Sequence, residues 1–214
     1  MSRITAKICG LSTPETLDAA IAGGASHVGF VFFAKSPRNV DFDQVRALAA
    51  RVPAHVGNAG VFVDPDDALI ETATAAGMLD VIQLHGKETP ERAAAIKDRT
   101  GREIWKALSI RTRADLAPAG DYRGAADRLL YDAKPPVGAD LPGGLGLRFD
   151  WHLLEGFVHP LPWALSGGLD AANIAEAVGI SGARLVDISS GVESAPGIKD
   201  VDKIAAFLKA TAQL

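Results

Sequence analysis

The sequence lacks several features that would place it in other classes of protein. A single cysteine among 214 residues rules out an internal disulfide and is typical of a reducing compartment. Basic residues (22) do not outnumber acidic ones (26), which argues against a nucleic-acid surface or attraction to anionic membranes. No apolar run approaches the ~20 residues of a membrane span. No long apolar stretch follows Arg3, so we expect no signal peptide and a cytoplasmic location.

Patterns for metal binding and base stacking are missing as well. No His, Asp or Glu cluster has the spacing of metal ligands, and the aromatic residues form no stacking pattern. Apolar residues, in contrast, make up 48% of the chain, and the mean hydropathy is +0.13. This composition supports a large core and argues against disorder. We find no linker, and we expect residues 1–214 to form one domain.

Strand and helix patterns alternate along the chain. Short runs of β-branched and aromatic residues, such as 27–32, indicate strands. Strict alternation favours a parallel sheet, and eight units in 214 residues fit a compact (β/α)8 TIM barrel. A doubly wound sheet is the alternative, but residues 10–13 lack its glycine-rich fingerprint. The expected strands are 4–9, 27–32, part of 55–63, 80–85, 103–108, 128–132, 162–165 and 184–189.

The expected helices differ in strength. Thr13-Pro14 and Asp41 are typical helix starts, because a capping side chain satisfies the free N–H groups of the first turn. Residues 133–147 form a long loop rich in Gly and Pro. The clear helices are 11–23, 41–52, 64–77, 90–99, 171–178 and a last one opened at residue 200; the weak ones are 111–116 and 150–155.

In a TIM barrel the active site lies at the carboxyl ends of the strands, and Cys9 and Asp132 both occupy such positions. A lone cysteine is most often a small buried hydrophobe, and an aspartate after a strand often caps a helix. Pro135-Pro136 makes an immediate helix after Asp132 improbable. Strands one and six lie nearly opposite each other, so a base at Cys9 and an acid at Asp132 would suit an isomerase.

Lys7 shares the inward face of the first strand with Cys9, because side chains alternate along a strand. A free thiol is only slightly ionised near neutral pH, so it needs a nearby cation or a reaction that tolerates a small active fraction. Asp187 lies on the eighth strand, which neighbours the first in a closed barrel. We therefore expect Asp187 to neutralise Lys7, which makes Lys7 a structural residue.

Two further side chains are candidates for substrate binding. Arg38 lies in a loop longer than a βα unit needs, and it is either a solvated arginine or a clamp for a carboxylate. His85 follows Gln83 on the inward face of the fourth strand. It either fills the barrel or contacts the substrate, and we favour contact.

Glycine-rich loops follow the seventh and eighth strands, where TIM barrels frequently bind phosphate. Glycine lets backbone N–H groups approach an anion closely, although it also favours ordinary tight turns. The two loops together predict a phosphate site. Its candidate residues are Gly167, Gly168, Ser190 and Gly191.

Along its whole length the chain resembles the phosphoribosylanthranilate isomerase family. No single motif is specific, but their number and order are. The matching motifs are Lys7-Ile8-Cys9-Gly10, Gly29-Phe30, Ser36-Pro37-Arg38, Gly60-Val61-Phe62-Val63, Gln83-Leu84-His85-Gly86, Trp105-Lys106-Ala107, Asp132, Gly143-Gly144, Phe149-Asp150-Trp151, Ser166-Gly167-Gly168-Leu169, Asp187-Ile188-Ser189-Ser190-Gly191-Val192-Glu193, Pro196-Gly197 and Lys199-Asp200.

The resemblance implies an Amadori rearrangement of N-(5-phosphoribosyl)anthranilate in tryptophan biosynthesis. Asp132 would be the general acid, Cys9 the general base and Arg38 the residue that holds the anthranilate carboxylate. Asp187 would touch the sugar hydroxyls instead of, or besides, pairing with Lys7. The glycine-rich loops would hold the phosphate. The substrate supplies its own electron sink, so neither a metal nor an organic cofactor is implied.

One position departs from the family pattern. The family usually has a Ser or Thr between glycines before Phe-Asp-Trp, where this chain has Leu145. A loop that closes through that hydroxyl would have to close differently here. Two alternatives remain open: another phosphosugar isomerase or epimerase on the same barrel, and a non-catalytic phosphosugar-binding barrel. The sequence does not define the oligomeric state.

Overall fold

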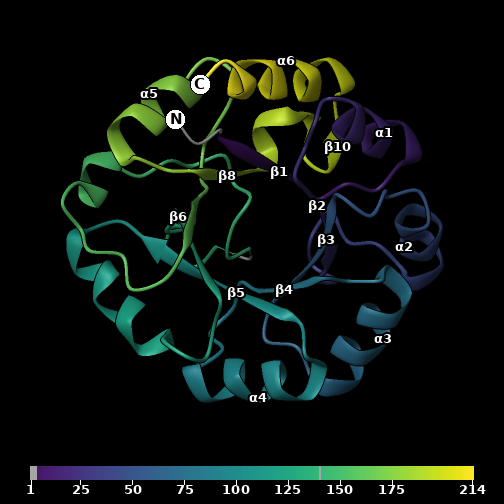
Figure 1. The fold of residues 1–214 in the computed structure, drawn as a ribbon, viewed down its shortest axis with the longest axis horizontal. Helices are drawn as coiled ribbons and strands as arrows, with labels where there is room; N and C mark the ends of the chain where they lie inside the picture. Colours follow the sequence, from purple (N-terminus) through teal and green to yellow (C-terminus); the bar gives the residue numbers. More distant parts are fainter. Residues whose placement is uncertain (1–3, 140) are drawn as a thin grey trace.

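The structure is a computed structural model that describes residues 4–139 and 141–214. Eight parallel strands close into a barrel in sequential order, with β8 paired to β1 (Figure 1). This confirms the predicted TIM barrel. The strands are β1 Thr5–Cys9, β2 His27–Phe32, β3 Gly57–Phe62, β4 Val81–Leu84, β5 Glu103–Ile110, β6 Arg128–Ala133, β7 Trp163–Leu165 and β8 Leu185–Ile188.

Helices surround the barrel (Figure 1). They are α1 Pro14–Ala22, α2 Phe42–Ala49, α3 Asp67–Gly77, α4 Pro90–Thr100, α5 Ile174–Ser181 and α6 Val201–Ala212. Thr13 and Asp41 each accept a hydrogen bond from a backbone N–H in the first turn, so the predicted starts of α1 and α2 are confirmed. None of the helices in the described part of the chain combines the length and apolar character that a membrane span requires.

The structure differs from the prediction in the second half of the chain. The weak helices are 3₁₀ helices, η1 Arg113–Tyr122 and η2 Trp151–Leu154. Helix α5 begins at Ile174 and not at residue 171, because the Asp170 carboxylate accepts the N–H groups of residues 172 and 173 in a turn. Residues expected to be a loop after β8 form the turn η3 Ser190–Val192 and a hairpin, β9 Glu193–Ala195 and β10 Ile198–Lys199.

Side chains alternate between two cores. Outward-facing residues such as Phe30 and Tyr131 pack against the helices. Inward-facing residues form a smaller apolar cluster that fills the barrel, made of Ala59, Val81, Trp105, Ala107, Leu130, Ala164 and Leu185. Toward the carboxyl ends of the strands the inward positions become polar, and Lys7, Asp132 and Asp187 are all buried there. The apolar layer therefore forms the floor beneath a polar pocket.

Candidate active site

One pocket opens at the carboxyl ends of the barrel strands, and every site residue predicted from the sequence lines it. The pocket takes residues from the ends of β1 to β4, from β6 to β8, and from the segment 141–147, which we call the β6 loop. The fold thus brings together groups that lie up to about 180 positions apart in the chain. In the described residues, no three His, Cys, Asp or Glu side chains are grouped so that they could hold a metal ion.

Cys9 lies beside a buried ion pair. The parallel register of β1 and β8 places Lys7 opposite Asp187, and the Lys7 ammonium donates to Asp187 Oδ1 at 3.0 Å. The predicted pairing is confirmed. A Cβ at Gly29 would come within 3.0 Å of Cys9 Sγ and 3.1 Å of Lys7 Cε. Glycine on β2 therefore leaves the space that both side chains occupy.

The charges around Cys9 oppose one another. Burial raises the pKa of the Cys9 thiol, and the Lys7 ammonium partly offsets this by favouring the thiolate. Burial also works against the charged form of Lys7, but the Asp187 carboxylate and then the thiol hold the Lys7 pKa above its ordinary value. At neutral pH, Cys9 is therefore mainly a neutral thiol next to a charged ammonium.

Asp132 lies at the end of a hydrogen-bonded chain of side chains. Asp132 Oδ2 is 3.1 Å from His85 Nε2, and Oδ1 accepts the N–H of Ala133 at 2.8 Å. On its other side, His85 Nδ1 is 3.2 Å from the side-chain nitrogen of Gln83. His85 thus lies against the predicted acid as well as lining the pocket. Gln83, which is fully buried, completes this chain. The sequence placed Gln83 on the inward face of its strand but did not predict the contact with His85.

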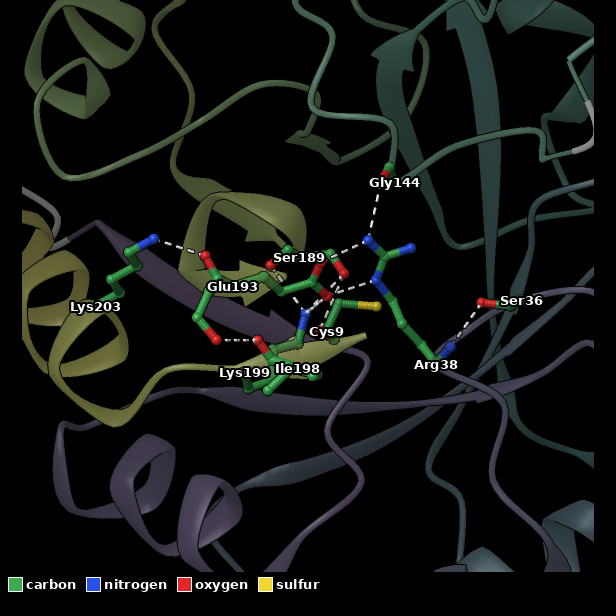
Figure 2. Close-up of polar contacts among 10 residues, drawn as sticks. Cys9, Ser36, Arg38, Gly144, Ser189, Glu193, Ile198, Lys199 and Lys203 are labelled. Carbon is green, nitrogen blue, oxygen red and sulfur yellow. Dashed lines mark hydrogen bonds and ion pairs between the residues drawn. The ribbon is translucent and has the colours of Figure 1, made fainter. Parts of the chain in front are cut away.

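Arg38 is buried, so the alternative of a solvated arginine is wrong. Its Nε and Nη2 groups donate to the two carboxylate oxygens of Glu193 at 2.7 and 2.8 Å, and Nη2 also donates to the Gly144 carbonyl at 3.0 Å (Figure 2). Lys199 donates to the same Glu193 carboxylate at 2.7 Å. Sequence reasoning missed both Glu193 and Lys199, although both lie in motifs that carry the family resemblance.

The glycine-rich loops depend on glycine for their backbone geometry. Gly167 and Gly168 have positive φ angles of 89° and 61°. A Cβ at Gly191 would overlap the backbone carbonyl of Leu169. Both loops line the pocket, and most of their lining residues are glycines and serines. This arrangement suits an anion, because N–H groups can approach it without obstruction.

The β6 loop lies over both sides of the pocket. A Cβ at Gly143 would come within 2.7 Å of Asp132 Oδ2, and one at Gly144 within 2.7 Å of Arg38 Nη1. Leu145, which replaces the hydroxyl residue of the family, lines the pocket with 42% of its surface exposed. The contact between Arg38 and this loop uses the Gly144 carbonyl, so it requires no side-chain hydroxyl.

The fold and the pocket together define the general class of this protein. The chain forms a closed (β/α)8 barrel, and its pocket holds a thiol, a carboxyl group and two glycine-rich loops at the carboxyl ends of the strands. These are features of a TIM-barrel isomerase. The family model described as N-(5'phosphoribosyl)anthranilate (PRA) isomerase matches residues 6–210. The chain belongs to this family, and it is an enzyme.

Individual relatives agree with this assignment. N-(5'-phosphoribosyl)anthranilate isomerase of Zymomonas mobilis subsp. mobilis is 59% identical over 208 residues, which cover 97% of each chain. The crystal structure of phosphoribosyl anthranilate isomerase from Thermotoga maritima superposes with a TM-score of 0.88 at 33% identity, over 100% of both chains. The crystal structure of a phosphoribosyl anthranilate isomerase in complex with reduced 1-(o-carboxyphenylamino)-1-deoxyribulose 5-phosphate superposes with a TM-score of 0.85 at 32% identity, over 100% of both chains.

Proposed function

We propose that this chain catalyses the Amadori rearrangement of N-(5-phosphoribosyl)anthranilate to 1-(2-carboxyphenylamino)-1-deoxyribulose 5-phosphate in tryptophan biosynthesis. The observation that carries the proposal is that Cys9 and Asp132 line one pocket together with Arg38 and the glycine-rich loops. The substrate carries two anions, a carboxylate and a phosphate, and the pocket offers a group that suits each. The reduced product analogue bound to a relative supports the choice of substrate.

Asp132 acts first, as the general acid. It gives its proton to the ribose ring oxygen while the bond from C1 to that oxygen breaks, and the lone pair of the anthranilate nitrogen forms the C1=N iminium. His85 lies against Asp132 Oδ2 at 3.1 Å and holds the carboxyl group in place. An acid that is positioned in this way contributes ~10²–10⁴-fold in rate.

Cys9 acts second, as the general base. Its thiolate removes the proton from C2, and the electron pair forms the C1=C2 bond while the iminium electrons return to nitrogen. The resulting enolamine then tautomerises to the ketone. The iminium acidifies C2 and is itself the electron sink, so the chemistry requires neither a metal nor an organic cofactor. A thiol with a raised pKa suffices, because the proton it removes is unusually acidic.

The remaining site residues bind and orient. Arg38 holds the anthranilate carboxylate through the N–H groups on Nη1, because Glu193 and the Gly144 carbonyl already accept from Nε and Nη2. Asp187 accepts from a sugar hydroxyl with the oxygen that Lys7 leaves free, and His85, which lines the pocket, contacts the substrate. Backbone N–H groups of Gly167, Gly168, Ser190 and Gly191 hold the phosphate. We also retain the cytoplasmic location and the single domain over 1–214 as part of this proposal.

A direct assay tests the proposed function. Phosphoribosylanthranilate is fluorescent through its anthranilate group, so its consumption can be followed continuously, with EDTA present throughout. We expect turnover that EDTA does not affect. A purified, folded protein that leaves this substrate unchanged but isomerises another phosphosugar would refute the substrate. Turnover that disappears only with EDTA would refute the metal-free chemistry.

A further inference from the structure

Arg38, Glu193 and Lys199 form a buried group that we call the Arg38 cluster (Figure 2). We propose that Glu193 and Lys199 are positioning residues that determine the preference of the site for a substrate with an aromatic carboxylate. Glu193 fixes one edge of the Arg38 guanidinium, and Lys199 offsets the Glu193 charge. The inference rests on the proposed function, because it assigns Arg38 to the carboxylate end of the substrate.

The hydrogen bonds of Arg38 leave one end of its guanidinium for a ligand. The Glu193 carboxylate accepts hydrogen bonds from Nε and Nη2 at 2.7 and 2.8 Å, and the Gly144 carbonyl accepts one from Nη2 at 3.0 Å. In the part of the chain that the structure describes, the two N–H groups on Nη1 have no hydrogen-bond acceptor. Arg38 also lines the pocket. Glu193 therefore turns a flexible side chain into a fixed donor with a single free end.

The charge of the cluster explains why a second cation is needed. Arg38 and Glu193 alone would cancel, and a neutral pair attracts an incoming carboxylate weakly. Lys199 Nζ lies 2.7 Å from Glu193 Oε1 and adds a second cation to the cluster. Burial lowers the pKa of Lys199, but the Glu193 carboxylate opposes this by favouring the charged ammonium. Burial works against the charged form of Glu193, but Arg38 and Lys199 together hold the pKa of that carboxyl below its ordinary value. Glu193 is therefore ionised and partnered on both sides.

Lys199 also connects the carboxylate end of the pocket to the phosphate end. Its ammonium donates to the backbone carbonyl of Ser189 at 2.9 Å and contacts Ser189 Oγ at 3.0 Å (Figure 2). Ser189 Oγ in turn donates to the Cys9 carbonyl at 3.2 Å. Ser189 directly precedes the predicted phosphate residues Ser190 and Gly191. One buried ammonium thus fixes the spacing between the two anion-binding ends.

The β9–β10 hairpin exists outside the barrel sheet, and the cluster gives it a role. Glu193 and Lys199 are paired across this hairpin, and Lys203 at the start of α6 donates to the Glu193 carbonyl at 2.7 Å. Both the backbone and the side chain of Glu193 are therefore fixed. The hairpin brings to Arg38 a carboxylate, and to that carboxylate an ammonium, that no barrel strand supplies.

Two ligands that differ in one group test the proposal. One is the reduced product analogue with its carboxyphenyl ring, and the other is the same molecule with an unsubstituted phenyl ring. Dissociation constants are measured by calorimetry for the wild type, Glu193→Gln and Lys199→Met. We expect the wild type to bind the carboxylated ligand at least ~10-fold more tightly, as for a charge-assisted pair. Both variants should lose most of this preference, with ~2-fold or smaller changes for the phenyl ligand.

Matched controls separate positioning from a change in overall charge. Glu176→Gln on α5 and Lys209→Met on α6 make the same charge changes at exposed positions, and we expect both to keep the wild-type preference. Thermal unfolding shows which variants are folded. If Glu193→Gln does not fold, the charge-balanced double variant Glu193→Gln/Lys199→Gln and the shorter Glu193→Asp replace it, and both should lose the preference.

A merely structural role would weaken both ligands equally, and this outcome would overturn the proposal. A wild type without preference for the carboxylated ligand, or folded variants that retain it, would overturn it as well. The proposed function is tested separately by turnover. If the wild type fails to turn over phosphoribosylanthranilate but Glu193→Gln still abolishes the preference, the reaction is wrong and the positioning role stands.

Discussion

Cys9 and Asp132 have very different surroundings, although both end barrel strands and line the same pocket. Cys9 lies beside the buried Lys7–Asp187 ion pair, in which a 3.0 Å contact between the partners favours both charges against the effect of burial. Asp132 lies in a chain of groups that can be neutral, through His85 to Gln83. The base side therefore holds fixed charges, whereas the acid side consists of groups that can rearrange their hydrogens.

The chain on the acid side can form with its hydrogen bonds running in either direction. If the Gln83 amide N–H donates to His85 Nδ1, the proton of the ring is on Nε2 and is donated to an ionised Asp132. If the amide is turned, Nδ1–H donates to the Gln83 oxygen, and Nε2 accepts from a protonated Asp132. The orientation of the amide and the tautomer of the ring are assigned from such networks. The hydrogen bonds of this chain can thus reverse their direction without breaking.

The largest effects are expected when either side is removed altogether. Cys9→Ala and Asp132→Asn should each lower kcat by ~10²–10⁴-fold, the usual contribution of one positioned acid or base. Each variant should still bind the reduced product analogue, because the Arg38 cluster and the glycine-rich loops are intact. The measurements are the fluorescence assay and calorimetry. A variant with near-wild-type kcat at either position would end the acid–base assignment.

The next largest effect tests whether the buried charges of Lys7 and Asp187 stabilise each other. Lys7→Met leaves Asp187 buried without its cation, and we expect a loss of ~3–5 kcal/mol in the free energy of unfolding. The double variant Lys7→Met/Asp187→Leu removes both charges and should recover most of this loss. On the acid side, Gln83→Leu disturbs only neutral hydrogen bonds and should cost ~1–2 kcal/mol. Urea unfolding measures all three.

The Lys7→Met variant should also change the titration of the Cys9 thiol. Burial raises the Cys9 pKa and Lys7 opposes this, so removing Lys7 should raise the pKa further, and the thiolate fraction at a given pH should fall. Cys9 is the only cysteine, so the rate of alkylation as a function of pH reports it alone. A lower Cys9 pKa in Lys7→Met would contradict the described arrangement of charges. Equal losses in the free energy of unfolding for Lys7→Met and Gln83→Leu would contradict it as well.

The sequence predicts those parts of this arrangement that depend on local patterns. Strand alternation placed Lys7 and Cys9 on one face, and the order of strands in a barrel brought Asp187 beside Lys7. The contact between Arg38 and Glu193 joins residues 155 positions apart, and no periodic pattern indicates it. The ion pair between Lys106 and Glu88 was missed for the same reason, since buried charges look like surface charges in a sequence.

The start of α5 shows a second limit. Residues 171–178 have helical periodicity, but Asp170 satisfies the first N–H groups in a turn, and the helix begins three positions later. Local side-chain hydrogen bonds of this kind compete with helix formation and shift its ends. The hairpin after β8 was missed because its strands have only three and two residues, too few to show alternation.

The smallest effect is expected where the β6 loop connects the two sides of the pocket. Leu145→Ser restores the hydroxyl that relatives in the family usually carry. The loop approaches Asp132 through Gly143 and is held by Arg38 through the Gly144 carbonyl, and neither contact uses the side chain of residue 145. Leu145 is 42% exposed, and substitutions at such positions usually change stability by less than ~0.5 kcal/mol. We therefore expect kcat/KM and the free energy of unfolding to stay within ~2-fold and ~0.5 kcal/mol of the wild type. A gain of tenfold or more in kcat/KM would mean that closure depends on the hydroxyl after all, and that the Arg38 contact is only part of what holds the loop over Asp132.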